Sequence, residues 1–175
     1  MTNRSDKKRD KGEQARQLLN RGAVLLEKGK AKDAIPHLER ARELEGDNVA
    51  VLINLGGAYV MAGRHREAIP PLEEARGFEP DNAMIWINLG AAYLGNPVLA
   101  TAEQQMRAIE AFERALELNP VAPNVHYNLG LIFVDRGDSE LAVAAFEQAL
   151  QANPFDEDAR YWLRKLGDGE EAEDD

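Results

Sequence analysis

Residues 86–93, WINLGAAY, and residues 108–120, AIEAFERALELNP, contain the pattern that decides the fold of this 175-residue chain. The glycine of the first stretch recurs in the same frame at intervals of 34, 34 and 40 residues, at Gly22, Gly56, Gly90 and Gly130. An aromatic residue or leucine follows each glycine by three positions, at Leu25, Tyr59, Tyr93 and Phe133. Internal repetition at such periods is typical of arrays of stacked structural units.

The second stretch also recurs, as an alanine, a large apolar residue four positions later and another alanine three positions after that. The four triplets are Ala34/Leu38/Ala41, Ala68/Leu72/Ala75, Ala108/Phe112/Ala115 and Ala142/Phe146/Ala149. Because spacings of three and four share one helical face, each triplet predicts an amphipathic helix. Proline then ends that helix at Pro80, Pro120 and Pro154. Each unit is therefore predicted to be two helices joined by a tight turn, at Gly29, Gly63 and Gly137 in three of the units.

This frame resembles the tetratricopeptide repeat. All its signature positions are matched in one unit by Trp86, Leu89, Gly90, Tyr93, Ala108, Phe112, Ala115 and Pro120. The resemblance covers about residues 15–155 and implies an all-α fold, a right-handed α-solenoid of antiparallel helix pairs. A single helix pair cannot bury its apolar stripe, so neighbouring pairs must stack.

The repeat frame also predicts the organisation of the chain. We expect a repeat domain over 15–166, with units at 15–48, 49–82, 83–122 and 123–156, and a capping helix at 157–166. Within that last helix, Tyr161, Leu163 and Leu166 are predicted to face the array. Residues 1–14 read as a flexible charged flank and residues 167–175 as a disordered acidic tail.

The third unit carries six extra residues near 95–101, which predict a protruding loop. Asn96-Pro97 is a turn signal, and Thr101 with Gln104 predicts a capping box at the start of the next helix. Either this loop is a tolerated surface insertion or it is a feature of one rim of the array.

Composition restricts the classes of function. The net charge of −10 argues against nucleic acid as a partner, because nucleic-acid binding requires a basic surface. No apolar run reaches the length of about 20 residues that a membrane-spanning helix requires, so no membrane insertion is expected. The chain has no cysteine, which excludes disulfides and thiolate metal sites and favours a cytoplasmic location.

Residues suited to catalysis are few and scattered. His37, His65 and His126 occupy different phases of the repeat, and hydroxyl side chains are limited to Thr2, Ser5, Thr101 and Ser139. The sequence therefore predicts no enzyme, no catalytic residues, no metal site and no cofactor.

The candidate binding residues lie opposite the repeat glycines. Two positions before each glycine stands an asparagine, at Asn20, Asn54, Asn88 and Asn128. Two residues correspond to about 200° of helix rotation, so these side chains point away from the packed seam. In the resembled family this face lines the concave surface, and similar asparagine rows hold peptide backbone in the superhelix of O-linked N-acetylglucosamine transferase. An amide can donate to and accept from an extended peptide, although a row of polar residues on an exposed face would look the same.

Apolar residues accompany the asparagines and predict a groove on that face. They are Leu19, Ile53, Ile87, Tyr127, Met61, Met84 and Leu131. The basic residues that the family uses to clamp the C-terminal carboxylate of heat-shock chaperones are missing from the corresponding positions. We therefore predict a scaffold or adaptor that binds an extended or helical segment of a protein partner. Two alternatives stay open: self-assembly, with the groove filled by another protomer, and a dedicated chaperone or assembly factor for one protein complex.

Overall fold

The computed structural model describes residues 4–170, with side chains described for residues 9–167, and over this range the chain is helical without any strand. In chain order the elements are α1 (Arg4–Glu27), α2 (Ala31–Leu44), α3 (Val49–Met61), α4 (His65–Phe78), α5 (Ala83–Leu94), the short 3₁₀ helix η1 (Pro97–Leu99), α6 (Ala102–Leu118), α7 (Val125–Arg136), α8 (Ser139–Ala152) and α9 (Glu157–Glu170).

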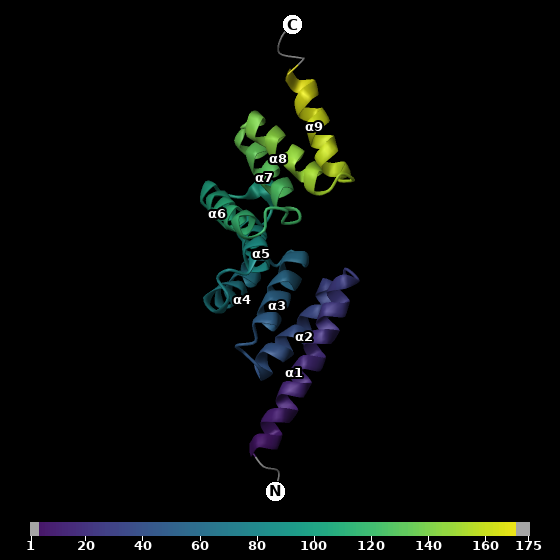
Figure 1. Cartoon of the computed structure of the whole chain (residues 1–175), viewed down its shortest axis with the longest axis vertical. Helices are drawn as coiled ribbons and strands as arrows, with labels where there is room; N and C mark the ends of the chain where they lie inside the picture. Colours follow the sequence, from purple (N-terminus) through teal and green to yellow (C-terminus); the bar gives the residue numbers. More distant parts are fainter. Residues whose placement is uncertain (1–3, 171–175) are drawn as a thin grey trace.

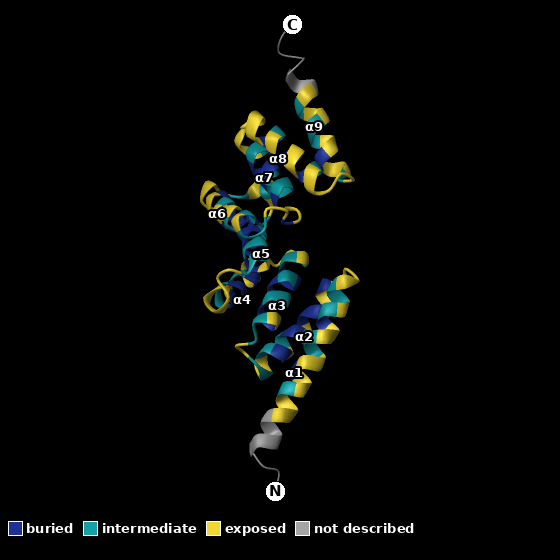
Figure 2. Cartoon of the chain, viewed as in Figure 1, coloured by how far each residue is buried: buried dark blue, intermediate teal, exposed yellow. Residues whose placement is uncertain are grey.

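Consecutive helices pack as antiparallel pairs, α1 with α2, α3 with α4, α5 with α6, and α7 with α8. Each pair also contacts the next pair along the chain, and the array is elongated, with its ends at opposite poles of the molecule (Figure 1). Buried residues lie where helices face one another, and exposed residues cover the outside (Figure 2). The predicted all-α solenoid is confirmed.

The repeat glycines lie where the two helices of a pair approach most closely. A Cβ added to Gly56 would lie 2.4 Å from Leu72, and one added to Gly130 would lie 2.6 Å from Phe146. The large residue of each alanine triplet therefore occupies the space that a side chain at the glycine would need. The alanines Ala34, Ala68 and Ala108 are completely buried beside these contacts.

The turns between paired helices follow the predicted chemistry. Gly29, Gly63 and Gly137 adopt positive φ angles of 69°, 74° and 77°, which glycine tolerates without the steric cost of a Cβ. Pro36, Pro70 and Pro71 lie within α2 and α4, near the helix starts. They are the sixth residue of α2 and the sixth and seventh of α4, past the unpaired N–H groups of the first turn, so each removes one intrahelical hydrogen bond.

The first helix begins earlier than the repeat frame suggests. It starts at Arg4, within the flank that we expected to be flexible, while residues 1–3 lie outside the described range. Lysine, arginine, glutamate and glutamine predominate in this stretch, and they are favourable helix formers. α1 also runs beside the end of α2, since a Cβ on Gly12 would lie 3.0 Å from Oε1 of Glu45.

The last helix, α9, packs on α8 and continues to Glu170, past the expected end at residue 166. Residues 171–175 of the expected acidic tail lie outside the described range. Leu163 and Leu166 face the array as predicted, but the prediction for Tyr161 is wrong, since its side chain is 52% exposed. Ala159 and Trp162 complete the packed face instead, because residues 159, 162, 163 and 166 share one side of a helix.

The insertion in the third unit forms η1, whose Val98 and Leu99 are exposed. The capping box of Thr101 and Gln104 is present at the start of α6, as predicted. η1 contacts α7, so the insertion lies beside the fourth unit.

Candidate peptide-binding surface

The first helices of the repeats form the inner layer of the array. α1 contacts α3, and α3 contacts α5, whereas the second helices α2, α4 and α6 make their main contacts with first helices. Direct contact between first helices means that they lie on the inside of the curvature. Asn20, Asn54 and Asn88 belong to this layer.

Two of the asparagines bond to their own helices. Nδ2 of Asn54 donates to the carbonyl oxygen of Ala50 at 2.8 Å, and Nδ2 of Asn128 donates to the carbonyl oxygen of Asn124 at 2.9 Å. Such bonds to the preceding helical turn restrict the side-chain rotamer. Within the part of the chain that the structure describes, neither Oδ1 accepts a hydrogen bond, so each amide keeps an acceptor and one N–H for another molecule.

Asn88 lies across the junction between the second and third units. Its Nδ2 is 3.5 Å from where a Cβ on Gly57 would be, so the amide rests against α3. Gly57 is one turn beyond Asn54 on the same helix, which makes Asn54 and Asn88 neighbours on the inner layer. The Asn88 amide has no hydrogen-bond partner among the described residues, and neither of its polar atoms is buried.

Asn20 and Asn128 are placed differently. Asn20 is exposed on α1, the first helix of the array. α7, which carries Asn128, makes its main contacts with α6, α8 and η1 rather than with α5. The insertion thus interrupts the layer of first helices between Asn88 and Asn128, which the sequence period alone does not indicate.

Most of the flanking apolar residues are partly used in packing. Leu19, Ile53 and Ile87 pack against the main core, while Tyr127 and Leu131 pack against the C-terminal cluster around Phe146. Each can offer only the part of its side chain that stays exposed.

The two methionines are the most exposed members of this set, at 56% for Met61 and 48% for Met84. Met61 is the last residue of α3 and Met84 is the second residue of α5, so they lie at opposite ends of the layer. They therefore do not line one continuous strip with the asparagines.

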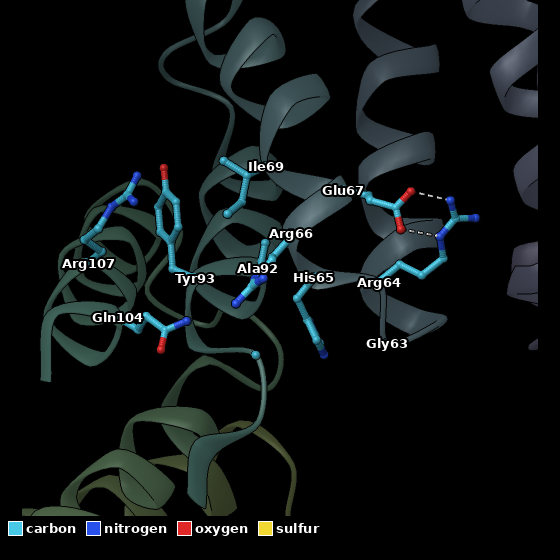
Figure 3. Close-up of a pocket in the computed structure, with 11 residues that line it drawn as sticks. Gly63, Arg64, His65, Arg66, Glu67, Ile69, Ala92, Tyr93, Gln104 and Arg107 are labelled. Carbon is cyan, nitrogen blue, oxygen red and sulfur yellow. Dashed lines mark hydrogen bonds and ion pairs between the residues drawn. The ribbon is translucent and has the colours of Figure 1, made fainter. Parts of the chain in front are cut away.

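A second concave feature was missed by sequence reasoning. A cavity of about 620 Å³ lies at the edge where α3 turns into α4, against the end of α5 and the start of α6. Its polar lining comes from Arg64, His65, Arg66, Glu67, Tyr93, Gln104 and Arg107 (Figure 3). Arg64 and Arg66 closely follow the turn glycine Gly63 in the sequence, and this was a signal for a basic site at the turn. Arg107 comes from another unit, and only the fold brings it next to them.

Two tyrosines support this edge. The hydroxyl of Tyr59 donates to Oε1 of Glu39 at 2.6 Å, and the hydroxyl of Tyr93 donates to Glu73. Burial, followed by the bond to Glu39, raises the pKa of Tyr59 to about 12, and burial and Glu73 likewise raise the pKa of Tyr93.

Arginines cover both tyrosine rings. The Arg64 guanidinium carbon lies 4.6 Å from the centre of the Tyr59 ring, and that of Arg107 lies 3.9 Å from the centre of the Tyr93 ring. Each ring thereby fixes the position of one arginine at this edge.

Other kinds of site find no support among the described residues. No group of three or more His, Asp or Glu side chains within residues 9–167 is arranged to hold a metal ion. In the described part of the chain, the helices are too short or too polar to span a bilayer.

Comparison with known families agrees with the repeat architecture. Models described as tetratricopeptide repeat match residues 25–86, 97–157 and 127–173, which together make up most of the chain. The chain is a member of the tetratricopeptide-repeat family. Domains of this family generally mediate protein–protein interaction and are generally not enzymes. No curated protein matches the sequence significantly.

Solved structures of similar fold cover most of the chain. A thermophilic tetratricopeptide-repeat protein of Thermus thermophilus, TTC0263, is 22% identical with a TM-score of 0.72, and the match covers 87% of this chain and 80% of that chain. MamA, in one crystal structure, is 25% identical with a TM-score of 0.72, and the match covers 93% of this chain and 86% of MamA. PilF of Pseudomonas aeruginosa is 19% identical with a TM-score of 0.74, and the match covers 93% of this chain and 72% of PilF. At these identities the similarity establishes the fold.

Proposed function

We propose that this protein is an interaction scaffold whose layer of first helices binds an extended or helical segment of a partner protein. Asn54 and Asn88 are the central contacts in this proposal, with Asn20 and Asn128 toward the two ends. The observation that carries it is the accessible amide of Asn88, unpaired among the described residues, next to Asn54 on the neighbouring helix. Two adjacent amides can donate to and accept from successive peptide groups of a bound segment.

The spacing of the helices fits this role. Neighbouring packed helices lie about 8–10 Å apart, and an extended peptide rises about 3.3 Å per residue. Asn54 and Asn88 would then meet backbone groups about three residues apart. The exposed parts of Ile53 and Ile87, one position before each asparagine, offer apolar contact to the side chains between.

A peptide selected from a random display library against the full chain tests the proposal. Binding of that peptide should weaken at least about tenfold in N54A/N88A, since each lost hydrogen bond contributes about 1 kcal/mol. The control Q148A/Q151A removes two exposed amides from α8, in the outer layer, and should bind like the parent protein. Circular dichroism should show equal helicity in all three proteins. Equal affinity in N54A/N88A and the parent would reject the asparagine row as the site.

A reducing, cytoplasmic setting is part of the same proposal, because the chain contains no cysteine. Self-association is the second candidate. The net charge is +3 over residues 1–48 and −5 over residues 157–175, and this difference favours self-association over a chaperone for a single client.

A further inference from the structure

The charge of this protein changes sign along the array. Residues 1–48 contain twelve Lys and Arg against nine Asp and Glu, a net charge of +3. Residues 123–156 contain one basic residue against five acidic ones, and residues 157–175 contain three against eight, net charges of −4 and −5. Residues 49–82 and 83–122 carry −2 each, so the C-terminal end is the most acidic part of the array and is attracted to local clusters of basic side chains on a second copy.

Five basic side chains lie along one edge of the first three units, where first helices turn into second helices. The 620 Å³ cavity on this edge is lined by Arg64, Arg66 and Arg107, with Glu67 as its one acidic lining residue. A neighbouring cavity of about 550 Å³, at the preceding turn, is lined by Lys30 and Lys32, with Asp33 as its acidic lining residue. We call the five residues Lys30, Lys32, Arg64, Arg66 and Arg107 the basic edge.

Two of the arginines in the larger cavity are available to a ligand. Arg64 pairs with Glu67, but neither Arg66 nor Arg107 forms a salt bridge with any side chain that the structure describes. Arg107 is held in place by the ring of Tyr93, and Figure 3 shows it beside that ring, with Arg66 on the facing helix α4. Nδ1 of His65, in the same wall, is buried without a hydrogen-bond partner among the described residues.

The chain itself contains a segment complementary to this cavity. Six of the eight residues from Asp168 to Asp175 are acidic. α9, which leads into the segment, packs on α8 at the C-terminal pole of the array, whereas the cavity lies between the second and third units (Figure 1). α7 and α8 lie between α9 and the wall of the cavity that α6 forms, which favours the cavity of another copy as the partner of this segment.

We propose that the acidic segment 168–175 of one copy binds the basic edge of a second copy, with its carboxylates on Arg66 and Arg107. Arginine pairs with carboxylates through two parallel hydrogen bonds, which suits a run of acidic side chains in a preformed cavity. The contact joins different surfaces of the two copies, so it produces rings or open chains rather than a closed two-fold dimer. It uses none of the asparagines of the inner layer.

Sedimentation velocity of the full chain over a concentration series tests this assignment. At low ionic strength the mean mass should rise with concentration, and the association should weaken strongly at about 0.5 M salt, where exposed charges are screened. R66E/R107E should weaken association at least about tenfold. Because Arg107 also packs on Tyr93, R66E is measured alone and should weaken association at least about threefold. R9E/R21E, which reverses two exposed arginines of α1, is the matched control and should associate like the parent.

A charge exchange makes the test specific. A variant with the six acids of residues 168–175 changed to lysine should not associate alone, nor should R66E/R107E. Mixed together, the two variants should associate again, because each supplies the partner that the other has lost. A parent protein that stays monomeric, an equal loss in R9E/R21E, or a mixture without rescue would each overturn the proposal. N54A/N88A should leave association unchanged, which separates this test from that of peptide binding.

Discussion

Gly90 of α5 lies directly beneath the ring of Phe112 of α6, so that a Cβ on the glycine would come within 2.4 Å of Cε1 of that ring. The two residues are 22 positions apart in the sequence and belong to the two helices of the third unit, on either side of the insertion. Gly56 and Leu72 stand in the same relation in the second unit, which lacks the insertion. The contact between the helices is therefore kept, and the extra residues are accommodated at the turn.

Replacing Gly90 with alanine should destabilise the array. The added methyl group would overlap a completely buried ring, and overpacking of this kind costs about 1–3 kcal/mol. The gain in helix propensity offsets at most about 1 kcal/mol of that cost. Urea denaturation should therefore show a lower free energy of unfolding.

Gly77 offers the matched control for this change. It lies near the end of α4 with no atom within 4 Å of an added Cβ, so G77A should be neutral or stabilise by up to about 1 kcal/mol. Equal effects of G90A and G77A would show that the packing argument fails.

Tyr59 should make stability depend on pH in the alkaline range. The unfolded phenol ionises near pH 10, while burial and Glu39 raise the pKa of Tyr59 in the folded protein to about 12. The protonated phenol therefore stabilises the folded state below about pH 10, and this contribution is lost as pH rises toward about 12. Y59F should show a weaker decline in the free energy of unfolding over that range.

The Glu39 partner separates the two causes of this shift. E39Q should lower the pKa of Tyr59 only in part, because burial is the larger cause and remains. An absorbance titration of the phenolate, compared between the parent, E39Q and Y59F, measures this directly. If the difference between the titration curves of the parent and Y59F is that of one tyrosine with an ordinary pKa, the assignment is refuted.

Trp162 should hold the capping helix on the array. Its ring stacks on Phe146 with ring centres 6.0 Å apart, and it is partly buried in the C-terminal cluster. W162A should cost about 2–4 kcal/mol by the loss of a large aromatic contact. Limited proteolysis should then cut α9 first. R164A, at an exposed position of the same helix, should change stability by less than about 0.5 kcal/mol, and an equal effect of both would contradict the packing described for α9.

Gln105 should connect the third unit to the fourth. Its buried amide donates from Nε2 to Asp135 at 2.6 Å and accepts at Oε1 from Nε of Arg136 at 3.1 Å. Q105A should cost about 1–3 kcal/mol, since both partners carry charge. Hydrogen exchange should accelerate in α7 and α8 more than in α3 and α4. The control Q148A changes an exposed glutamine in α8 and should leave the exchange pattern unchanged. An unchanged pattern in Q105A would show that Gln105 does not connect the two units.

Much of the fold could be predicted because the relevant physics is local. The period of glycine, alanine and large apolar residues predicted the helix pairs, the turn glycines and the capping box of Thr101 and Gln104. The errors arose where packing chose between adjacent residues. Tyr161 was expected to face the array, but Trp162 fills that space because the angle of α9 against α8 decides which face is covered.

The candidate site was predictable only in outline. Counting back from each glycine identified the asparagine positions, and these remain the basis of the proposed peptide contacts. The sequence did not indicate that η1 interrupts the layer before Asn128. The opposite placement of Met61 and Met84 was readable, because Met61 follows Gly56 by five residues and Met84 precedes Gly90 by six.

The sequence alone determined that this chain is a stack of helix pairs, because helical periodicity and the steric fit of glycine against leucine or phenylalanine act within one unit. Only the tertiary structure brought Arg66 of α4 and Arg107 of α6 to one cavity. These residues belong to different units, and their approach depends on the angle at which the units stack. That angle results from the packing of the whole junction and has no signature in any single stretch of sequence.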